Sequence, residues 1–178
     1  MNVVDEHHSL SARVRKWDFR MLELAQLVST WSKDPSTKIG AVIARPDCTV
    51  LSLGFNGFPR GTDDSEVLYA VRERKYERVV HAELNAILTS PERPHGCTLY
   101  VYPPALIPGT CARCAAAVIQ AGIRRVVCLE SALLPFNERW RASYEEAFTL
   151  YREAGVTVTV YTKGVFEEWQ KAKAAASC

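Results

Sequence analysis

Residues 111–129 read CARCAAAVIQAGIRRVVCL, and this stretch decides the fold class. The alanine-rich segment 111–121 predicts a helix, Gly122 suits the position that follows a helix end, and 125–129 has the β-formers of a strand. The same order of helix, glycine and strand returns around Gly155. Two such units in succession are typical of helices that cross between neighbouring parallel strands.

The elements on either side of this stretch complete the pattern. Hydrophobic periodicity predicts helices at 14–31, 79–89, 140–154 and 165–175, and strands at 39–44, 49–55, 97–102 and 156–161. The first two strands are joined by a short turn at Pro46 and Asp47, which favours an antiparallel hairpin. A hairpin followed by strands that alternate with helices predicts an α/β fold, a three-layer α/β/α sandwich around a mixed five-stranded sheet.

Length and composition limit the domain organisation. A chain of 178 residues suits one domain, which buries about 70% of the surface of its unfolded chain. Residues 1–12 are polar and are expected to form a flexible tail before a single domain at 13–178. Residues 62–78 are charged and poorly periodic, so we expect a loop with some helix there.

Composition and charge also exclude several classes of function. The chain has no apolar run of 18 residues, and its first residues contain no signal-peptide core, so we expect a cytoplasmic protein without a membrane span. The net charge is +2 and the pI is near 8.2, whereas strong nucleic-acid binders usually have a pI above about 9. A nucleic-acid partner is therefore not expected, while a small anionic ligand fits this charge.

Two short motifs carry the predicted chemistry, and each begins a predicted helix. The first is His81-Ala82-Glu83, and the second is Cys111-Ala112-Arg113-Cys114. Facing helix starts can bring one imidazole and two thiolates to a single ion, a ligand set that suits Zn²⁺. Three protein ligands leave a fourth position for water, as in catalytic zinc sites. Because two thiolates offset the charge of the ion, a nearby base such as Glu83 is needed to take the proton of the water.

A structural zinc or a redox dithiol is the alternative interpretation. A structural site would require a fourth Cys or His, and the nearby candidates, His95 and Cys97, lack the usual spacing. The isolated residues Cys48, Cys97 and Cys128 are predicted to be small buried hydrophobic side chains.

Several stretches together resemble a known family. HAELNAI at 81–87, CARC at 111–114 and IQAGI at 119–123 resemble the cytidine and deoxycytidylate deaminase superfamily. SKDPSTKIGA at 32–41 and GFNGFPRG at 54–61 are similar to deoxycytidylate deaminases. The resemblance covers about residues 17–160 and implies a cytidine-deaminase-like fold.

The resemblance also implies a reaction. His81, Cys111 and Cys114 would hold Zn²⁺, and Glu83 would shuttle protons while water attacks C4 of the base and ammonia leaves. The expected enzyme is a zinc-dependent hydrolase that converts dCMP to dUMP by cleaving the C–N bond of a cyclic amidine. The alternatives are deamination in another context, either tRNA adenosine or free cytidine and deoxycytidine, or a non-catalytic zinc-binding module.

The substrate contacts rest on a smaller set of residues. Lys33, Ser36 and Lys38 offer cations and a hydroxyl in one loop, as a 5′-phosphate site requires, although a solvated polar turn has the same composition. The resemblance favours the phosphate site and a contact of Asn56 with the sugar. Tyr102 is a candidate for stacking on the base or for a simple core position.

Further expectations come from the resemblance alone. Arg60 and Arg113 are candidate phosphate partners. The family usually has proline directly before the first metal cysteine, whereas this chain has Thr110, which is expected to cap the following helix, after an unusually long loop at 103–110. Family members are typically homo-oligomers, often hexamers, and many respond to dCTP and to dTTP with Mg²⁺.

Overall fold

The computed structural model describes residues 12–103, 110–130 and 138–176 of the chain. Its helices are α1 (Ala12–Ser29), α2 (Glu66–Ala70), α3 (Arg72–Arg78), α4 (Ala82–Leu88), α5 (Ala112–Ala121), α6 (Glu138–Glu153) and α7 (Lys163–Ala175). Its strands are β1 (Gly40–Ala44), β2 (Val50–Phe55), β3 (Thr98–Tyr102), β4 (Arg125–Leu129) and β5 (Thr157–Tyr161). Every predicted helix and strand is present, with bounds shifted by three residues at most.

The segment expected to be a loop with some helix contains two short helices, α2 and α3, so that prediction is confirmed. The predicted tail at 1–12 lies outside the described residues except for Ala12, which begins α1. Most of the unusual loop at 103–110 also lies outside them.

The five strands form one mixed sheet in the order β2-β1-β3-β4-β5. Strand β1 pairs antiparallel with both β2 and β3, which confirms the predicted hairpin. Strands β3, β4 and β5 are parallel, as expected for strands that are linked by crossing helices.

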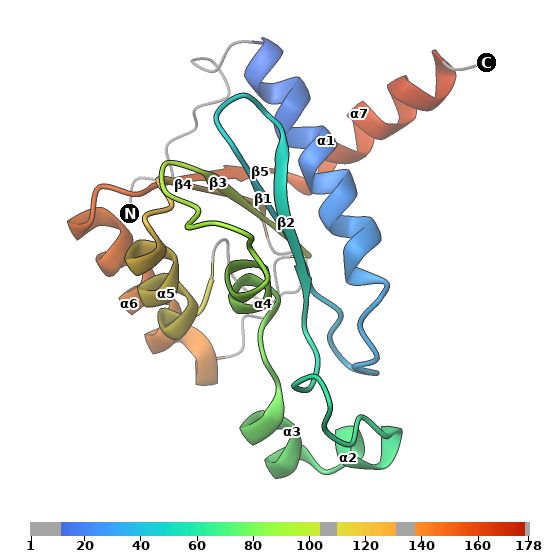
Figure 1. Cartoon of the computed structure of the whole chain (residues 1–178). Coiled ribbons are helices and arrows are strands. Elements are labelled where there is room, and N and C mark those ends of the chain that lie inside the picture. The colour runs from blue at the N-terminus through green and yellow to red at the C-terminus, as the bar shows by residue number, and fades with distance from the viewer. Residues whose placement is uncertain (1–11, 104–109, 131–137, 177–178) are drawn as a thin grey trace.

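Helices cover both faces of the sheet and make the predicted three layers. Figure 1 shows α1 and α7 on one face and α4, α5 and α6 on the other. The alternation of side chains along β3 divides the core accordingly: Leu99 and Val101 join the cluster under α4, α5 and α6, while Tyr100 joins the cluster under α1 and α7. None of the helices in the described residues combines the length and apolar composition that a membrane crossing requires.

Two glycines let helices lie directly on the hairpin. A Cβ atom on Gly40 would lie 2.0 Å from the carbonyl oxygen of Ala25 in α1. A Cβ atom on Gly54 would lie 2.3 Å from the carbonyl oxygen of Ala82 and 2.4 Å from the backbone nitrogen of Ala86, both in α4. These contacts leave no room for a side chain, so both positions require glycine and the position of α4 is set by the backbone of β2.

A buried ionic cluster joins α1 to the sheet on the other face. The Asp18 carboxylate is 1% exposed and accepts hydrogen bonds from both Arg125 terminal nitrogens, at 2.8 and 2.7 Å. The Tyr100 and Tyr161 hydroxyls donate to the same carboxylate, at 3.0 and 2.7 Å. The four side chains therefore satisfy one another and fix α1 against β3, β4 and β5.

The isolated cysteines divide into two groups. Cys97 and Cys128 are 4% and 0% exposed, as predicted for small hydrophobic side chains. The prediction for Cys48 is wrong, because this residue is half-buried and lies in the β1–β2 turn with a φ of 70°. It belongs to the turn that reverses the hairpin, which is why it does not enter the core.

Candidate metal centre

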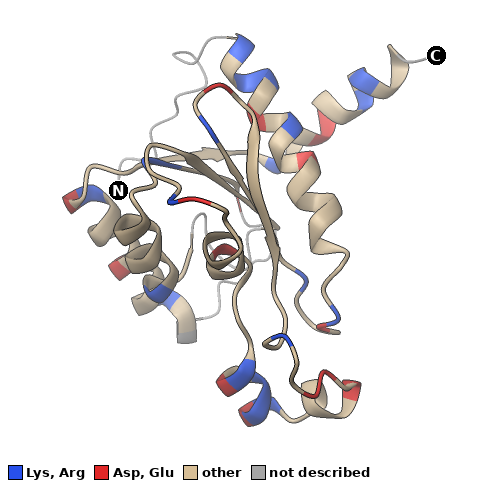
Figure 2. Cartoon of the chain, viewed as in Figure 1, with Lys and Arg blue, Asp and Glu red and all other residues tan. Residues whose placement is uncertain are grey.

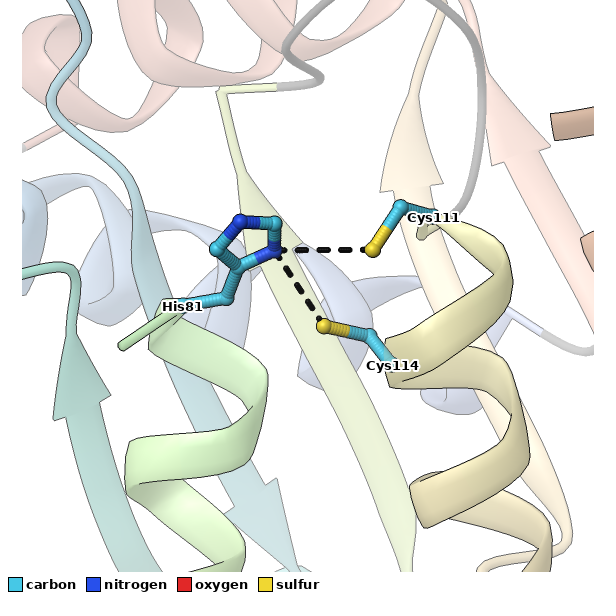
Figure 3. Close-up of side chains that lie close together, drawn as sticks. All are labelled: His81, Cys111 and Cys114. Carbon is cyan, nitrogen blue, oxygen red and sulfur yellow. Dashed lines mark hydrogen bonds between the residues drawn. The ribbon is translucent and has the colours of Figure 1, made fainter. Parts of the chain in front are cut away.

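The three predicted metal-binding side chains meet at the starts of two helices. His81 directly precedes α4, Cys111 directly precedes α5, and Cys114 lies in the first turn of α5. His81 Nδ1 is 3.5 Å from Cys111 Sγ and 3.4 Å from Cys114 Sγ (Figure 3). One donor atom from each residue lies within 4.8 Å of the other two, so all three can bind one ion.

Packing explains why these two helix starts converge. Ala82 and Ala86 of α4 and Ala115 and Val118 of α5 are fully buried in the same core cluster on one face of the sheet. Small alanines allow both helices to approach the sheet and each other closely. Helix α5 follows β3, so its start lies at the carboxyl end of a parallel strand, the edge at which α/β proteins commonly bind ligands.

Glu83 points into the same place from the first turn of α4. Its side chain is 4% exposed, and its Oε2 is the one buried side-chain oxygen or nitrogen atom of the described residues without a hydrogen-bond partner. Burial raises the pKa of the Glu83 carboxyl, and the positive charge of His81 opposes this only in part. A buried carboxylate oxygen without a partner fits a site that receives a further group, such as a metal with its water.

The three donor side chains also shift one another's pKa values. A hydrogen bond from the Cys114 thiol, helped by hydrogen bonds from His81 and from the Cys114 N–H, lowers the pKa of Cys111 to about 4. The pKa of Cys114 is raised because it donates to Cys111 and is buried beside Glu83. A hydrogen bond to Cys111 raises the pKa of His81. Of the three side chains, Cys111 is therefore the one shifted toward the deprotonated form that binds a metal.

Helix α6 contacts the start of α5 beside this centre, a contact that could not be predicted from the sequence. The Ser143 hydroxyl accepts a hydrogen bond from the Ala112 N–H at 3.2 Å, and the Tyr151 and Thr110 hydroxyls share a hydrogen bond at 2.6 Å. Burial raises the pKa of Tyr144, and the charges of Cys111, Glu83 and Cys114 raise it further. The predicted cap at Thr110 is wrong, because Cys111 occupies the cap position.

One of the predicted loop residues, Ser36, belongs to a second polar cluster, which is built around Asp34. Asp34 is 1% exposed and accepts hydrogen bonds from the Ser36 backbone and hydroxyl, both at 2.9 Å, and from Lys75 of α3 at 2.7 Å. Burial raises the pKa of Asp34, but these hydrogen bonds outweigh it and the net pKa is lowered. Lys33 is instead exposed and pairs with Asp64 at 2.7 Å.

Asn56 is the buried connector of this cluster. Its Oδ1 accepts from the Ile39 N–H at 2.7 Å, and its Nδ2 donates to the Thr37 carbonyl at 2.7 Å and to Asp34 at 3.4 Å. The Asn56 amide therefore sets the path of the loop before β1, and its contact with a sugar stays a prediction.

The remaining candidate residues do not belong to the Asp34 cluster. The Tyr102 hydroxyl accepts from Gln26 of α1 at 2.9 Å, and its ring packs against the cluster under α1 and α7. Arg113 is exposed on α5, where its charge opposes protonation of His81. Lys38 and Arg60 are exposed in their loops.

Two members of the second cluster were not predicted as site residues. Asp34 lies inside the stretch 32–41 that carries the resemblance. Its burial marks it as the centre of a polar cluster, but that burial appears only in the folded structure. Lys75 lies in a charged, weakly periodic segment, where nothing local separates it from its neighbours.

Comparison with known proteins agrees with this geometry. Residues 15–130 match a family model described as the cytidine and deoxycytidylate deaminase zinc-binding region. A protein named an uncharacterized deaminase in the luxG 3′ region of Aliivibrio fischeri is 40% identical over 148 residues, which cover 82% of this chain and 94% of that protein. The deoxycytidylate deaminase of Mus musculus is 34% identical over 155 residues, covering 83% of this chain and 80% of that protein.

Solved structures support the fold. The dCMP deaminase of the cyanophage S-TIM5 has a TM-score of 0.60 and 21% sequence identity, over 85% of this chain and 99% of that chain. This likeness confirms the expected deaminase-like sandwich. The family match spans more than half of the chain and includes His81, Glu83, Cys111 and Cys114, and this chain therefore belongs to the cytidine and deoxycytidylate deaminase family.

Proposed function

We propose that this chain catalyses the zinc-dependent hydrolytic deamination of dCMP to dUMP, with release of ammonia. The observation that carries the proposal is the buried Glu83 Oε2, which has no hydrogen-bond partner among the described residues and lies beside three convergent donor side chains. The mouse relative named deoxycytidylate deaminase, at 34% identity, supports dCMP as the substrate.

The residues of the chain have distinct tasks in this reaction. A zinc ion on His81, Cys111 and Cys114 supplies Lewis acidity, which makes water a nucleophile near neutral pH. Glu83 takes the proton of the attacking water as the new C4–O bond forms, since its raised pKa suits a group that holds a proton. Glu83 delivers this proton to the ring nitrogen, then takes the remaining proton of the added hydroxyl group and delivers it to the leaving amine. The C4–N bond breaks, and dCMP and water become dUMP and ammonia.

The loop that contains Asp34 is proposed to receive the phosphate of the nucleotide. Lys33, Ser36 and Lys38 are exposed on one loop, where their cations and hydroxyl can approach a 5′-phosphate. Asn56 fixes the path of this loop through its hydrogen bonds to Ile39 and Thr37, and we propose that it also contacts the sugar.

Two further residues, both arginines, are proposed as substrate contacts. Arg113 lies on the first turn of α5, close enough to His81 to act on its pKa, and is proposed to pair with the phosphate. Arg60, exposed in the loop that follows β2, is a second proposed phosphate partner. Tyr102 is not proposed as a stacking residue, because its ring packs under α1 and α7, on the opposite face of the sheet from α4 and α5.

Assembly and regulation are also proposed for the single domain at 13–178. The rings of Trp31 and Phe55 contact each other beside the edge strand β2 and are 49% and 38% exposed, which suits a contact between subunits of a homo-oligomer, a hexamer by resemblance. dCTP and dTTP with Mg²⁺ are the proposed effectors. Free thiols at the five described cysteines suit the reducing cytoplasm.

A substrate panel tests the proposed function. The loss of cytosine absorbance is followed with dCMP, deoxycytidine and cytidine, and inosine formation is followed with tRNA, each with and without dCTP and dTTP. We expect dCMP to be preferred at least tenfold, whereas equal efficiency on deoxycytidine would remove the phosphate site. Figure 2 shows basic and acidic residues together on α3, not one basic field, so activity on tRNA is not expected.

The Glu83→Ala variant tests the mechanism and the non-catalytic alternative together. It should keep one zinc per chain, measured by metal analysis, because Glu83 is not one of the three ligands. Its kcat on dCMP should fall by about 10²–10⁴-fold, the usual contribution of a general acid–base. Turnover at the wild-type rate would show that Glu83 has no such role.

A further inference from the structure

Cys111 owes its position to the backbone on either side of it. Cys111 is the residue directly before α5, and its Sγ points toward His81 Nδ1 (Figure 3). The first N–H groups of a helix have no acceptor within the helix and need one from elsewhere. Because the Cys111 sulfur is committed to the metal centre, any further acceptor for this turn has to come from another element.

Helix α6 supplies that acceptor. The N–H of Ala112, the first residue of α5, donates to the Ser143 hydroxyl at 3.2 Å. Ser143 lies 31 positions further along the chain and is half-buried, so this bond joins two helices and not two turns of one helix. It holds the peptide unit that links Cys111 to Ala112.

The same helix also holds the side chain of the residue on the other side of Cys111. Thr110 is 2% exposed, and its hydroxyl shares a 2.6 Å hydrogen bond with the Tyr151 hydroxyl, which belongs to another 2% exposed side chain. Short buried hydrogen bonds between two hydroxyls are costly to break, because either partner left alone has no water to replace the other. The residues before and after Cys111 are thus both bound to α6.

We propose that Ser143 and Tyr151 are positioning residues of the metal centre, which hold the Cys111 sulfur at the distance that the ion requires. The inference rests on the metal centre of the proposed function but not on the identity of its substrate. Outer partners of metal ligands typically change metal affinity or activity by about 10–100-fold when they are removed. The effect reaches the ion through the backbone, since neither hydroxyl is a ligand.

The test measures zinc release from the full chain without substrate. Zinc-loaded protein is mixed with excess chelating dye, and the release rate is compared for wild type, Ser143→Ala and Ser143→Thr. Thr149→Ala is the matched control, because Thr149 is also on α6 but its hydroxyl donates only to the Glu145 carbonyl of the same helix. We expect release from Ser143→Ala to be about tenfold faster. Ser143→Thr keeps a hydroxyl and should stay near the wild-type rate, as should Thr149→Ala.

Two outcomes would overturn the inference. Release from Ser143→Ala at the wild-type rate would show that the bond does not position Cys111, and equal acceleration in Thr149→Ala would show a general loosening of α6. If Ser143→Ala does not fold, Tyr151→Phe takes its place with the same expected acceleration and the same control. Zinc release is independent of turnover, so a wild type that holds zinc but leaves dCMP intact would contradict the proposed function alone.

Discussion

The Asp34–Lys75 pair predicts an asymmetry between its two partners. The Asp34 and Lys75 side chains are 2% and 12% exposed, and their charged atoms are 2.7 Å apart. Lys75→Met leaves Asp34 with its hydrogen bonds from Ser36 and Thr37, so the variant loses only the charge-assisted bonds, about 1.5–3 kcal/mol. Asp34→Ala leaves the Lys75 ammonium nearly buried and without its carboxylate, which costs about 3–5 kcal/mol.

The double variant gives the sharper test. When Asp34→Ala and Lys75→Met are combined, the unpaired ammonium disappears, so the double variant should be more stable than Asp34→Ala alone. The free energy of unfolding is measured in urea by tryptophan fluorescence at one fixed concentration of free zinc, because metal binding adds to stability. Lys33→Met is the control. The Lys33 side chain, which pairs with Asp64, is 62% exposed, so its loss should lower the free energy of unfolding by less than about 1 kcal/mol.

Acidification gives an independent check on the same pair. Hydrogen bonds hold the pKa of Asp34 below its ordinary value in the folded chain, despite burial. The stability from this carboxylate is therefore present above the ordinary aspartate pKa of about 3.9 and is lost as the pH falls through the folded value. Wild type should lose stability more steeply than Asp34→Ala on acidification. Equal slopes, or single-variant losses that simply add in the double variant, would refute the reasoning.

Two further substitutions test how the helices are held. Gly54→Ala should push α4 away from β2, since the new Cβ would lie 2.3 Å from the Ala82 carbonyl oxygen and 2.4 Å from the Ala86 nitrogen. We expect at least tenfold weaker zinc binding, measured by competition with a chelator. Unchanged zinc binding would contradict the claim that the β2 backbone sets the position of α4. Arg125→Met should cost about 3–5 kcal/mol of unfolding free energy in urea, because Asp18 is left charged and buried. A loss below 1 kcal/mol would show that the two tyrosine hydroxyls satisfy Asp18 unaided.

Much of the fold was predictable because its signals are local. The glycines after α5 and α6 both have positive φ, 86° at Gly122 and 68° at Gly155, as the helix–glycine–strand pattern requires. Alternation within β3 sends neighbouring side chains to opposite core clusters, which is also a local property. The burial of Cys48 was predicted wrongly, because a residue next to a strand can belong to the turn that follows it. Whether a side chain in such a turn is buried depends on where the turn lies on the folded protein.

The roles of polar residues were harder to predict. Asn56 and Ser36 appear in motifs of the family, but their hydrogen bonds to Ile39, Thr37 and Asp34 emerge only when the loop before β1 is folded. Lys75 reaches that loop from α3, and no period in the sequence marks it among its charged neighbours.

The sequence alone determined the ligand chemistry of this protein, because an imidazole, two thiolates and a carboxylate specify a type of metal site through their own electronic properties. The i, i+3 spacing of Cys111 and Cys114 across the start of one helix also favoured two sulfurs on the same side of that helix start. Only the tertiary structure decided that α6 holds Cys111 and that α3 holds Asp34. Those hydrogen bonds join segments that are tens of residues apart, and packing against the sheet, not local pattern, brings them within reach.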